Sequence, residues 1–378
     1  MKVLQIVKTA VGATWACEQV RVLCSLGIEV VVALPSDTES LAPKYREAGA
    51  TVIRASLDLP MRQSWRIPET LRVCREIVAS IQPDLIHTHH VGTTFVVRLA
   101  LGKNSRVPRV FQVAGPLHLE HSLFAALDVR TAGPQDRWIA TCRWTQRKYR
   151  EMGVSPDRVF LSYSGTDLKP FRGTRTGLLR RELGISPEIP LVGMVCYMYA
   201  PKWFLGQLHG LKGHEDFFAA FLRVREIRPE IRGVIIGGAW GNGAWYEKRL
   251  RRLGSDLCDG SLTFLGTRAD VPALYPDLDL AVVPSHTENV GGAVEPLLSG
   301  VPVVATNVGG LPDLVLQDQT GWLTPARDPE ALAKSILEVL GNREEARRRA
   351  QAGRKRAREL FDVEITGREI DTIYQKVA

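Results

Sequence analysis

The stretch PSHTENVGGAVEPLLSGVPVVAT, residues 284–306, carries the pattern that decides the fold. The apolar run LDLAVV before it predicts a buried strand, AVEPLLSG predicts a helix that stops at Gly300, and VPVVAT predicts the next strand. The loop HTENVGG therefore follows the carboxyl end of one strand and leads into a helix N-terminus. Free backbone N–H groups and the helix dipole favour an anion there, and glycines let the backbone approach a ligand closely.

Two carboxylates flank this loop. Glu288 lies within it, and Glu295 falls in the first turns of the predicted helix. A carboxylate at Glu295 can accept hydrogen bonds from two neighbouring hydroxyls, such as those of a ribose. It can equally compensate the helix dipole, so the segment alone leaves both interpretations open.

The same alternation of strand and helix patterns runs through all 378 residues, which is typical of βαβ units and parallel sheets. The length exceeds what one hydrophobic core usually supports, so two domains are expected. Glycines, prolines and charges interrupt the alternation, which places a linker near residues 168–187. We expect an α/β protein of two doubly wound, Rossmann-like domains. Their strand ends would face a central cleft, because ligands bind beyond the carboxyl ends of such strands.

Composition narrows the class of protein. Hydrophobic residues make up 45% and charged residues 24% of the chain, as in globular proteins. The start, MKVLQIVKTAVG, predicts a strand rather than a secretory signal, and no run approaches the roughly 20 apolar residues of a membrane span. These features favour a cytoplasmic protein, with any membrane contact peripheral and at the inner face. The six cysteines lack metal-site spacing and are expected to be free thiols.

The formal net charge of +8 indicates attraction to an anionic partner. Nucleotide phosphates, an acidic membrane surface and nucleic acid all have the required charge. The chain shows neither a nucleic-acid-binding signature nor a sheet of alternating aromatic and basic residues, so no nucleic-acid partner is expected.

The segment from PSHTENVGG to PEALAKSI resembles the nucleotide-sugar-binding segment of the family-4 retaining glycosyltransferases of the GT-B fold. Further segments occur in that family's order, including PDLIHTHH, IATCRWTQRKYREMGVSPDRVFLSYSG and LKGHEDFFAAF. The resemblance spans nearly the whole chain. It implies an N-terminal acceptor domain over residues 1–172, a C-terminal donor domain over residues 173–360, and a last helix, residues 361–378, that packs back on the first domain.

The resemblance also implies roles for individual residues. Glu295 resembles the glutamate that holds the donor ribose, Glu288 the glutamate that faces the transferred sugar, and Lys212 the lysine that neutralises the donor diphosphate. A fixed cation and helix amides can stabilise a departing diphosphate without a metal, so no metal and no cofactor are expected. The backbone of four turn residues would meet the sugar or its phosphates: Asn289, Val290, Gly291 and Gly292.

Several departures from the family pattern affect these roles. Six residues separate Glu288 and Glu295, one fewer than in the family. Tyr197 stands near the place of a family arginine, and the inserted APKWFLGQLHG precedes the lysine, so Lys202 and Arg268 are candidates for the missing cation. Gly12 in TAVGATW weakly resembles the family's glycine-rich loop near the diphosphate, and a plain strand-to-helix turn explains it equally well.

Histidines and basic segments give the remaining candidates. DLIHTHH lacks acidic or cysteine partners, so its histidines are expected to be structural or to line the cleft rather than to bind metal. His118 is a candidate catalytic or acceptor-contacting residue, with a simple loop or capping role as the alternative. The basic sequence NREEARRRAQAGRKRAREL predicts a solvated helix. LPMRQSWRIPETLR, with Arg62, Trp65 and Arg66, is a candidate contact for an acceptor or an anionic lipid surface.

The sequence therefore predicts a retaining glycosyltransferase. It would move a sugar from a nucleoside diphosphate sugar, with UDP-sugar favoured, to a hydroxyl of a carbohydrate or lipid-linked acceptor in polysaccharide, glycolipid or glycoconjugate biosynthesis. A nucleotide-sugar epimerase or phosphorylase of the same fold is one alternative. A nucleotide-binding scaffold that has lost catalysis is the other.

Overall fold

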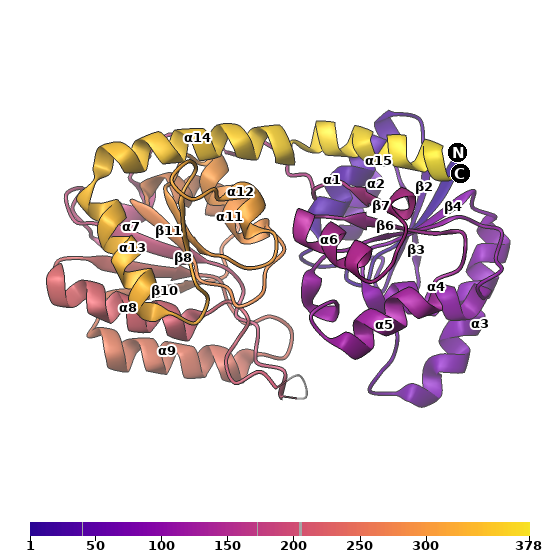
Figure 1. Cartoon of the computed structure of the whole chain (residues 1–378), viewed down its shortest axis with the longest axis horizontal. Coiled ribbons are helices and arrows are strands. Elements are labelled where there is room, and N and C mark those ends of the chain that lie inside the picture. The colour runs from indigo at the N-terminus through magenta and orange to yellow at the C-terminus, as the bar shows by residue number, and fades with distance from the viewer. Residues whose placement is uncertain (40, 172, 204–205) are drawn as a thin grey trace. The chain divides into compact units, whose positions relative to one another are not determined.

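The computed structural model describes residues 1–39, 41–171, 173–203 and 206–378. The chain divides into two compact units (Figure 1). Unit 1 comprises Met1–Asp167 and Leu360–Ala378, and unit 2 comprises Leu168–Glu359. No helix among these described residues has the length and apolar character needed to cross a membrane.

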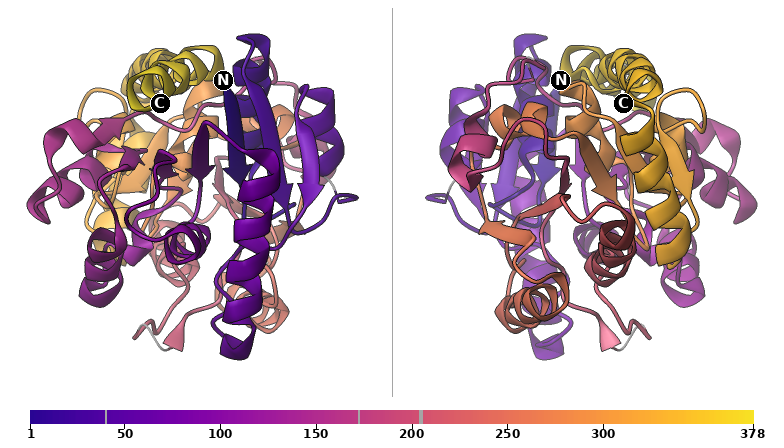
Figure 2. Two further views of the ribbon diagram at one scale, coloured as in Figure 1. Left: turned by 90° about the vertical axis from the view of Figure 1, so that its right-hand side faces the viewer. Right: turned by 90° about the vertical axis from the view of Figure 1, so that its left-hand side faces the viewer.

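Unit 1 is built on a seven-stranded sheet with the order β3-β2-β1-β4-β5-β6-β7, and its paired strands are parallel. Helices α1, α2 and α15 pack together on one face, and α3, α4 and α5 on the other (Figure 2). Its elements are β1 (Lys2–Ile6), α1 (Thr14–Ser25), β2 (Glu29–Leu34), α2 (Leu41–Glu47), β3 (Thr51–Arg54), α3 (Ile67–Ile81), β4 (Leu85–Thr88), α4 (Val91–Leu101), β5 (Arg109–Gln112), α5 (Ser122–Thr131), β6 (Asp136–Ala140), α6 (Arg143–Glu151), β7 (Val159–Leu161) and α15 (Val363–Val377).

Unit 2 is built on a six-stranded sheet with the order β10-β9-β8-β11-β12-β13, again with parallel pairs. Helices α8, α9 and α13 share one apolar core with the sheet. Its elements are α7 (Leu178–Leu183), β8 (Leu191–Val195), α8 (His214–Ile227), β9 (Arg232–Ile236), α9 (Ala244–Cys258), β10 (Leu262–Gly266), α10 (Val271–Leu274), β11 (Leu280–Val283), α11 (Gly291–Leu298), β12 (Val303–Thr306), α12 (Leu311–Leu314), β13 (Trp322–Thr324), α13 (Pro329–Gly341) and α14 (Arg343–Phe361).

The strands form where short runs of β-branched and other apolar residues occur. All four residues of β11, LAVV, and of β12, VVAT, are buried. Strands covered on both faces need apolar side chains on both sides, which is why continuous runs rather than alternating patterns specify them. The predicted strand, loop, helix and strand around residues 284–306 are confirmed, and the α/β fold class of two Rossmann-like units is confirmed with them.

Helix α15 completes unit 1. It packs against α1, and Glu364 pairs with Arg21 at 2.7 Å. The buried hydroxyl of Tyr374 lies 2.5 Å from His87 Nδ1 and accepts a hydrogen bond from Gln5 Nε2 at 3.2 Å. Burial lowers the pKa of His87 to about 3, so this histidine is neutral. The last helix is therefore tied to the sheet by a polar network as well as by apolar packing.

Each sheet has one point where the strand order reverses. In unit 1 this point lies between β1 and β4, and in unit 2 between β8 and β11. Ligands of open α/β sheets bind beyond the carboxyl ends of the strands at such a point, because the loops there diverge and leave a crevice. The loops after β8 and β11 are therefore the first place to look for a site in unit 2.

Candidate active site

Lys212 and Glu288 meet at the strand-order reversal of unit 2. Lys212 lies near the end of the loop between β8 and α8, and Glu288 lies in the loop between β11 and α11. The two loops are joined directly, since the His286 backbone N–H donates to the Leu211 carbonyl at 2.8 Å. The topology thus brings together two residues that are 76 positions apart in the sequence.

Gly213 allows this close approach. It precedes α8 with a φ of 70°, in the left-handed region that glycine adopts readily. A Cβ at this position would lie 2.0 Å from the Pro284 carbonyl oxygen. Any other residue would therefore force the Lys212 loop and the Pro284 loop apart.

The Lys212 ammonium forms an ion pair with Glu288 Oε2, and the side chains are 18% and 8% exposed respectively. Burial acts to lower the pKa of Lys212, but the attraction of Glu288 outweighs it, so the pKa lies above its usual value. Glu288 Oε2 also accepts from Ser285 Oγ at 3.1 Å, and Oε1 accepts from the Asn289 backbone N–H at 3.1 Å. The site thus contains a positioned cation beside a carboxylate that accepts hydrogen bonds from three donors.

The backbone on either side of Glu288 is fixed by a second loop. Gly309 has a φ of 52°, and a Cβ there would lie 1.8 Å from the Glu288 carbonyl oxygen. After Glu288 the chain turns through Asn289 and the buried Val290 into α11, which begins at Gly291. A Cβ at Gly292 would lie 3.2 Å from Glu288 Oε2, so the start of α11 runs beside the carboxylate.

Glu295 lies in α11 and is held apart from the ion pair by its own partner. Its carboxylate is hydrogen-bonded to the hydroxyl of Tyr275, which is 3% exposed. Burial raises the pKa of Glu295, and the hydrogen bond from Tyr275 offsets part of that rise. The Glu295 carboxylate is thus oriented and partly shielded from water. Both features suit a group that accepts hydrogen bonds from a ligand.

Aromatic rings border the pair. Lys212 Nζ lies 5.8 Å from the ring centroid of Tyr199, close enough for a cation–π contact. The ring of Tyr197 lies edge-on to that of Trp240, with centroids 4.9 Å apart. Tyr197 thus packs with Trp240, and its neighbour Tyr199 is the ring that faces the cation.

Three further predicted site residues lie outside these loops of unit 2. Arg268 is bonded to both Asp270 and Glu182, each at 2.7 Å, so its charge is neutralised within that cluster. Gly12 lies in unit 1, in the loop after β1, with a φ of 80°. His118 also belongs to unit 1.

His118 is part of a buried ionic network. Its Nε2 lies 3.3 Å from Asp128 Oδ2 and 3.2 Å from the Tyr149 hydroxyl. Burial acts to raise the pKa of Asp128, but Arg98, at 2.6 Å, holds it down to about 2. Arg98 continues the network to Asp136 at 2.9 Å. These contacts are those of a structural side chain, and contact of His118 with an acceptor stays a prediction.

The structure adds three residues that sequence reasoning missed: Ser285, Tyr199 and Tyr275. Ser285 had a local signal, because a serine three residues before a glutamate resembles a helix capping box. Tyr199 and Tyr275 had none, because their partners, Lys212 and Glu295, lie 13 and 20 residues further along the chain, beyond the reach of a local pattern. Among the described residues, no group of three or more histidine, cysteine, aspartate or glutamate side chains is arranged to hold a metal ion.

The fold and this site define a two-unit α/β enzyme of the GT-B class. Two family models match the chain: Glycosyl transferases group 1 over residues 203–356, and Glycosyltransferase Family 4 over residues 12–169. Together they match most of the chain, which therefore belongs to the family-4 glycosyltransferases. It is a glycosyltransferase by this membership.

Several known proteins are similar to this chain. D-inositol 3-phosphate glycosyltransferase of Acidothermus cellulolyticus is 28% identical over 85% of this chain and 75% of its own length. The structure of Anabaena Alr3699/HepE in complex with UDP-glucose aligns over the whole of both chains, with a TM-score of 0.81 and 20% identity. Sucrose-phosphate synthase from Thermosynechococcus elongatus aligns over 100% of this chain and 99% of its own, with a TM-score of 0.80 and 19% identity. At these identities, the two structures establish the fold.

Proposed function

We propose that this glycosyltransferase transfers a sugar, with retention of anomeric configuration, from a nucleoside diphosphate sugar to a hydroxyl acceptor. UDP-sugar is the favoured donor, and a carbohydrate or lipid-linked molecule is the favoured acceptor, as in polysaccharide, glycolipid or glycoconjugate biosynthesis. The observation that carries the proposal is the Lys212–Glu288 pair at the strand-order reversal of unit 2. The complex of Anabaena Alr3699/HepE with UDP-glucose supports the choice of donor.

Unit 2 is proposed as the donor domain and unit 1 as the acceptor domain. The donor diphosphate would take the place of Glu288 as partner of Lys212, because the diphosphate carries two negative charges and the carboxylate carries one. The N–H groups at the start of α11, from Gly291 onward, would complete the phosphate contacts. Glu295, oriented by Tyr275, would accept hydrogen bonds from the two ribose hydroxyls.

The reaction breaks the bond between the anomeric carbon and the diphosphate oxygen and forms a bond from the same carbon to the acceptor oxygen. Negative charge develops on the departing diphosphate, and the fixed ammonium of Lys212 is placed to stabilise it. The acceptor proton passes to a phosphate oxygen, so nucleoside diphosphate and glycosylated acceptor are the products. The released Glu288 would orient the transferred sugar. No metal and no cofactor are required by this scheme.

The exposed segment at the start of α3 supports peripheral contact with a membrane carrying lipid-linked acceptor. Met61 and Trp65 are 68% and 74% exposed, and Arg62 and Arg66 lie beside them at the surface. Apolar side chains next to basic ones suit an anionic lipid surface. Co-sedimentation with phosphatidylglycerol vesicles should be lost in the Met61→Ser/Trp65→Ser variant. It should be retained in the control variant Leu257→Ser, which changes an exposed residue of unit 2.

Proton NMR of UDP-glucose and other nucleotide sugars, followed over time with added enzyme, tests the proposed reaction. With a competent acceptor, UDP appears together with a new glycoside of the donor's anomeric configuration. A nucleotide-sugar epimerase would instead give a new nucleotide sugar without UDP, and a scaffold would give no change. A product of inverted configuration would contradict the retaining mechanism while leaving the transfer itself intact.

A further inference from the structure

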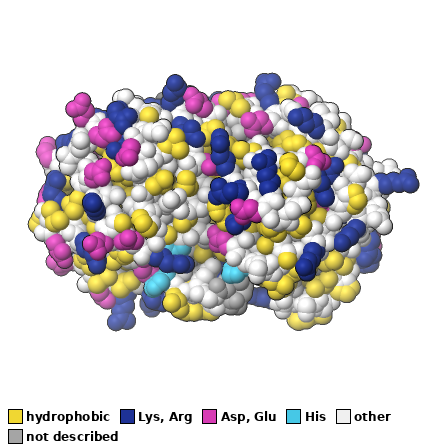
Figure 3. Space-filling view, viewed as in Figure 1, with side chains coloured by type: hydrophobic (Ala, Val, Ile, Leu, Met, Phe, Trp, Pro, Cys, Tyr) yellow, Lys and Arg dark blue, Asp and Glu magenta, His cyan; other side chains and the backbone are white. Residues whose placement is uncertain are grey.

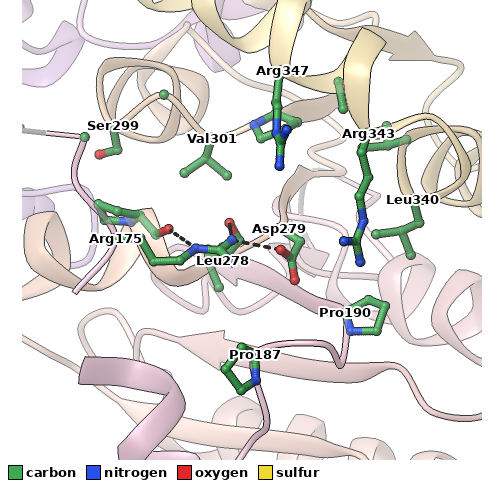
Figure 4. A pocket seen from close by; sticks show the side chains of 16 residues that line it. Arg175, Pro187, Pro190, Leu278, Asp279, Ser299, Val301, Leu340, Arg343 and Arg347 are labelled. Atoms are coloured by element: carbon green, nitrogen blue, oxygen red, sulfur yellow. Dashed lines mark hydrogen bonds and ion pairs between the residues drawn. The ribbon is translucent and has the colours of Figure 1, made fainter. Parts of the chain in front are cut away.

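A cavity of about 410 Å³ lies in unit 2, at the edge of the sheet opposite the Lys212–Glu288 pair (Figure 4). Its lining includes Pro190, Asp279 and Pro302, which directly precede strands β8, β11 and β12. These strands are parallel, so their amino ends share one edge of the sheet and their carboxyl ends the other. The cavity is therefore separate from the proposed donor site.

Positive charge dominates this cavity. Three arginines line it, Arg175, Arg343 and Arg347, against a single acidic lining residue among the described ones, Asp279. That carboxylate is already shared, since it accepts from Arg175 at 2.8 Å and from Arg180 at 2.5 Å. Within the described part of the chain, neither Arg343 nor Arg347 forms an ion pair with an acidic residue. The cavity thus carries positive charge that its own residues do not balance.

The positions of Arg343 and Arg347 lower the stability of α14. Arg343 begins α14 and Arg347 follows one turn later on the same side. A positive side chain opposes the helix dipole at an N-terminus, and like charges four residues apart repel. The nearby Glu345 pairs with Arg348 and Arg349 instead. An anion between the two guanidinium groups would relieve both effects.

The remaining walls suit a ligand with an uncharged body. Figure 4 shows Arg343 and Arg347 extending from α14 toward the cavity, with Arg175 on its other side. The Ser299 hydroxyl in the lining is buried and has no hydrogen-bond partner among the described residues. By contrast with the cavity, the face of the molecule shown in Figure 3 has basic and acidic side chains interspersed. The apolar wall is formed by Pro187, Pro190, Leu278, Val301 and Leu340.

We propose that this cavity is a second anion site that binds a phosphate group carried by a small molecule. Guanidinium groups bind phosphate oxygens through paired hydrogen bonds, and phosphate carries enough charge to balance Arg343 and Arg347 together. The apolar wall would contact the organic part of the ligand. A phosphorylated metabolite and a lipid phosphate headgroup offer the same chemistry. The site does not depend on the function proposed for the Lys212–Glu288 pair.

Calorimetric titration with inorganic phosphate and with pyrophosphate tests this site. The pocket variant is Arg343→Gln/Arg347→Gln, and its control is Lys355→Gln/Arg358→Gln, which removes the same charge from exposed positions on the same helix. Losing two charged hydrogen-bonding groups should weaken binding by about tenfold or more in the pocket variant. The control should bind within about twofold of the wild type, because only general surface charge is changed. Unfolding temperatures of both variants show whether each is folded.

A second arm identifies the source of the phosphate. Binding to phosphatidylglycerol vesicles that depends on Arg343 and Arg347 would assign the site to a lipid headgroup. Binding of the free anions that depends on these two arginines, with vesicle binding undiminished in the pocket variant, would assign it to a soluble metabolite. The proposal is overturned by equal losses in both double variants, by undiminished affinity in the pocket variant, or by the absence of saturable binding of either anion to the wild type. The donor site is unchanged in both variants, so nucleotide binding distinguishes failure here from failure of the proposed function.

Discussion

Units 1 and 2 share one topology but differ in what fills the strand-order reversal. In unit 1, His87, Gln5 and Tyr374 form a buried network of neutral groups. In unit 2, the loops beyond the reversal hold Lys212 and Glu288, a charged pair whose side chains are 18% and 8% exposed. Neutral buried side chains stabilise a domain, whereas a charged pair near solvent can exchange partners with a ligand. The fold thus supplies the location, and the side chains at the reversal decide whether that location is structural or chemical.

The largest expected effect comes from breaking the ionic network of unit 1. Asp128→Ala removes the carboxylate that contacts Arg98, Tyr149 and His118, and it leaves a buried guanidinium short of a partner. The free energy of unfolding should fall by about 3–5 kcal/mol. Denaturant unfolding measures this loss.

The control for that variant is Glu76→Ala, in which the exposed Arg72–Glu76 pair of α3 is broken. Its loss should be under about 1 kcal/mol, because exposed ion pairs contribute little. Similar losses in the two variants would contradict the structural role assigned to the network around Asp128.

Removing the Lys212 ammonium group should slow catalysis. Lys212→Ala is expected to lower kcat by about 10²–10³-fold, the usual cost of losing one group that stabilises a developing anion. Steady-state release of nucleoside diphosphate measures the effect, and Lys248→Ala at an exposed position of α9 serves as the control. Activity of Lys212→Ala equal to that of the control would remove Lys212 from the proposed mechanism.

A smaller effect on stability tests whether the network at the reversal point of unit 1 is structural only. Tyr374→Phe deletes the hydroxyl that contacts His87 and Gln5, and it should cost about 1–3 kcal/mol of stability without changing nucleotide affinity. Tyr45→Phe is the matched control, because the buried Tyr45 hydroxyl has no hydrogen-bond partner among the described residues. Thermal unfolding and nucleotide titration of both variants make the comparison. A loss of nucleotide affinity in Tyr374→Phe alone would tie the unit 1 network to ligand binding.

The smallest effect is a change in acid sensitivity. The unfolded chain binds a proton at His87 near pH 6.5, but burial lowers the folded pKa to about 3, so stability falls as the pH drops from about 6.5 toward 3. His87→Gln should reduce the loss between pH 6.5 and 5.5 by about 1 kcal/mol. His209→Gln, at a residue that is 46% exposed, is the control. The free energy of unfolding is measured for both variants at pH 6.5 and 5.5. An equal loss between these pH values in the two variants would contradict the account.

The sequence predicted local features better than distant contacts. The strand, loop and helix around Glu288 were predictable because β-branched runs and glycines act within a few residues. Membership of Lys212 in the same site came from a resemblance, since only the fold closes the long distance between the two residues. Tyr275 beside Glu295 could not be predicted, because no local pattern relates an aromatic residue to a carboxylate in another helix.

Two basic residues show the same limit in opposite ways. Arg268 was a candidate cation, and the structure pairs it with Asp270 and with Glu182, which lies 86 positions away in the sequence. Arg343 was assigned to a solvated helix and is exposed, and it also borders a cavity whose walls come from segments between Gly173 and Arg347. Charge is visible in a sequence, but the partners that balance it, or fail to, are set by tertiary structure.

The central claim is that unit 2 binds a nucleoside diphosphate through Lys212 and Glu295. A calorimetric and thermal-shift comparison of UDP, GDP and ADP on the wild type, Glu295→Ala and the exposed control Glu359→Ala tests it most directly. A ligand at about 100 times its Kd adds about 2.7 kcal/mol to the stability of the folded state. The account predicts selective stabilisation by UDP that persists in Glu359→Ala and is lost in Glu295→Ala. Stabilisation by none of the three nucleotides, or equal stabilisation of Glu295→Ala and the wild type, would contradict it.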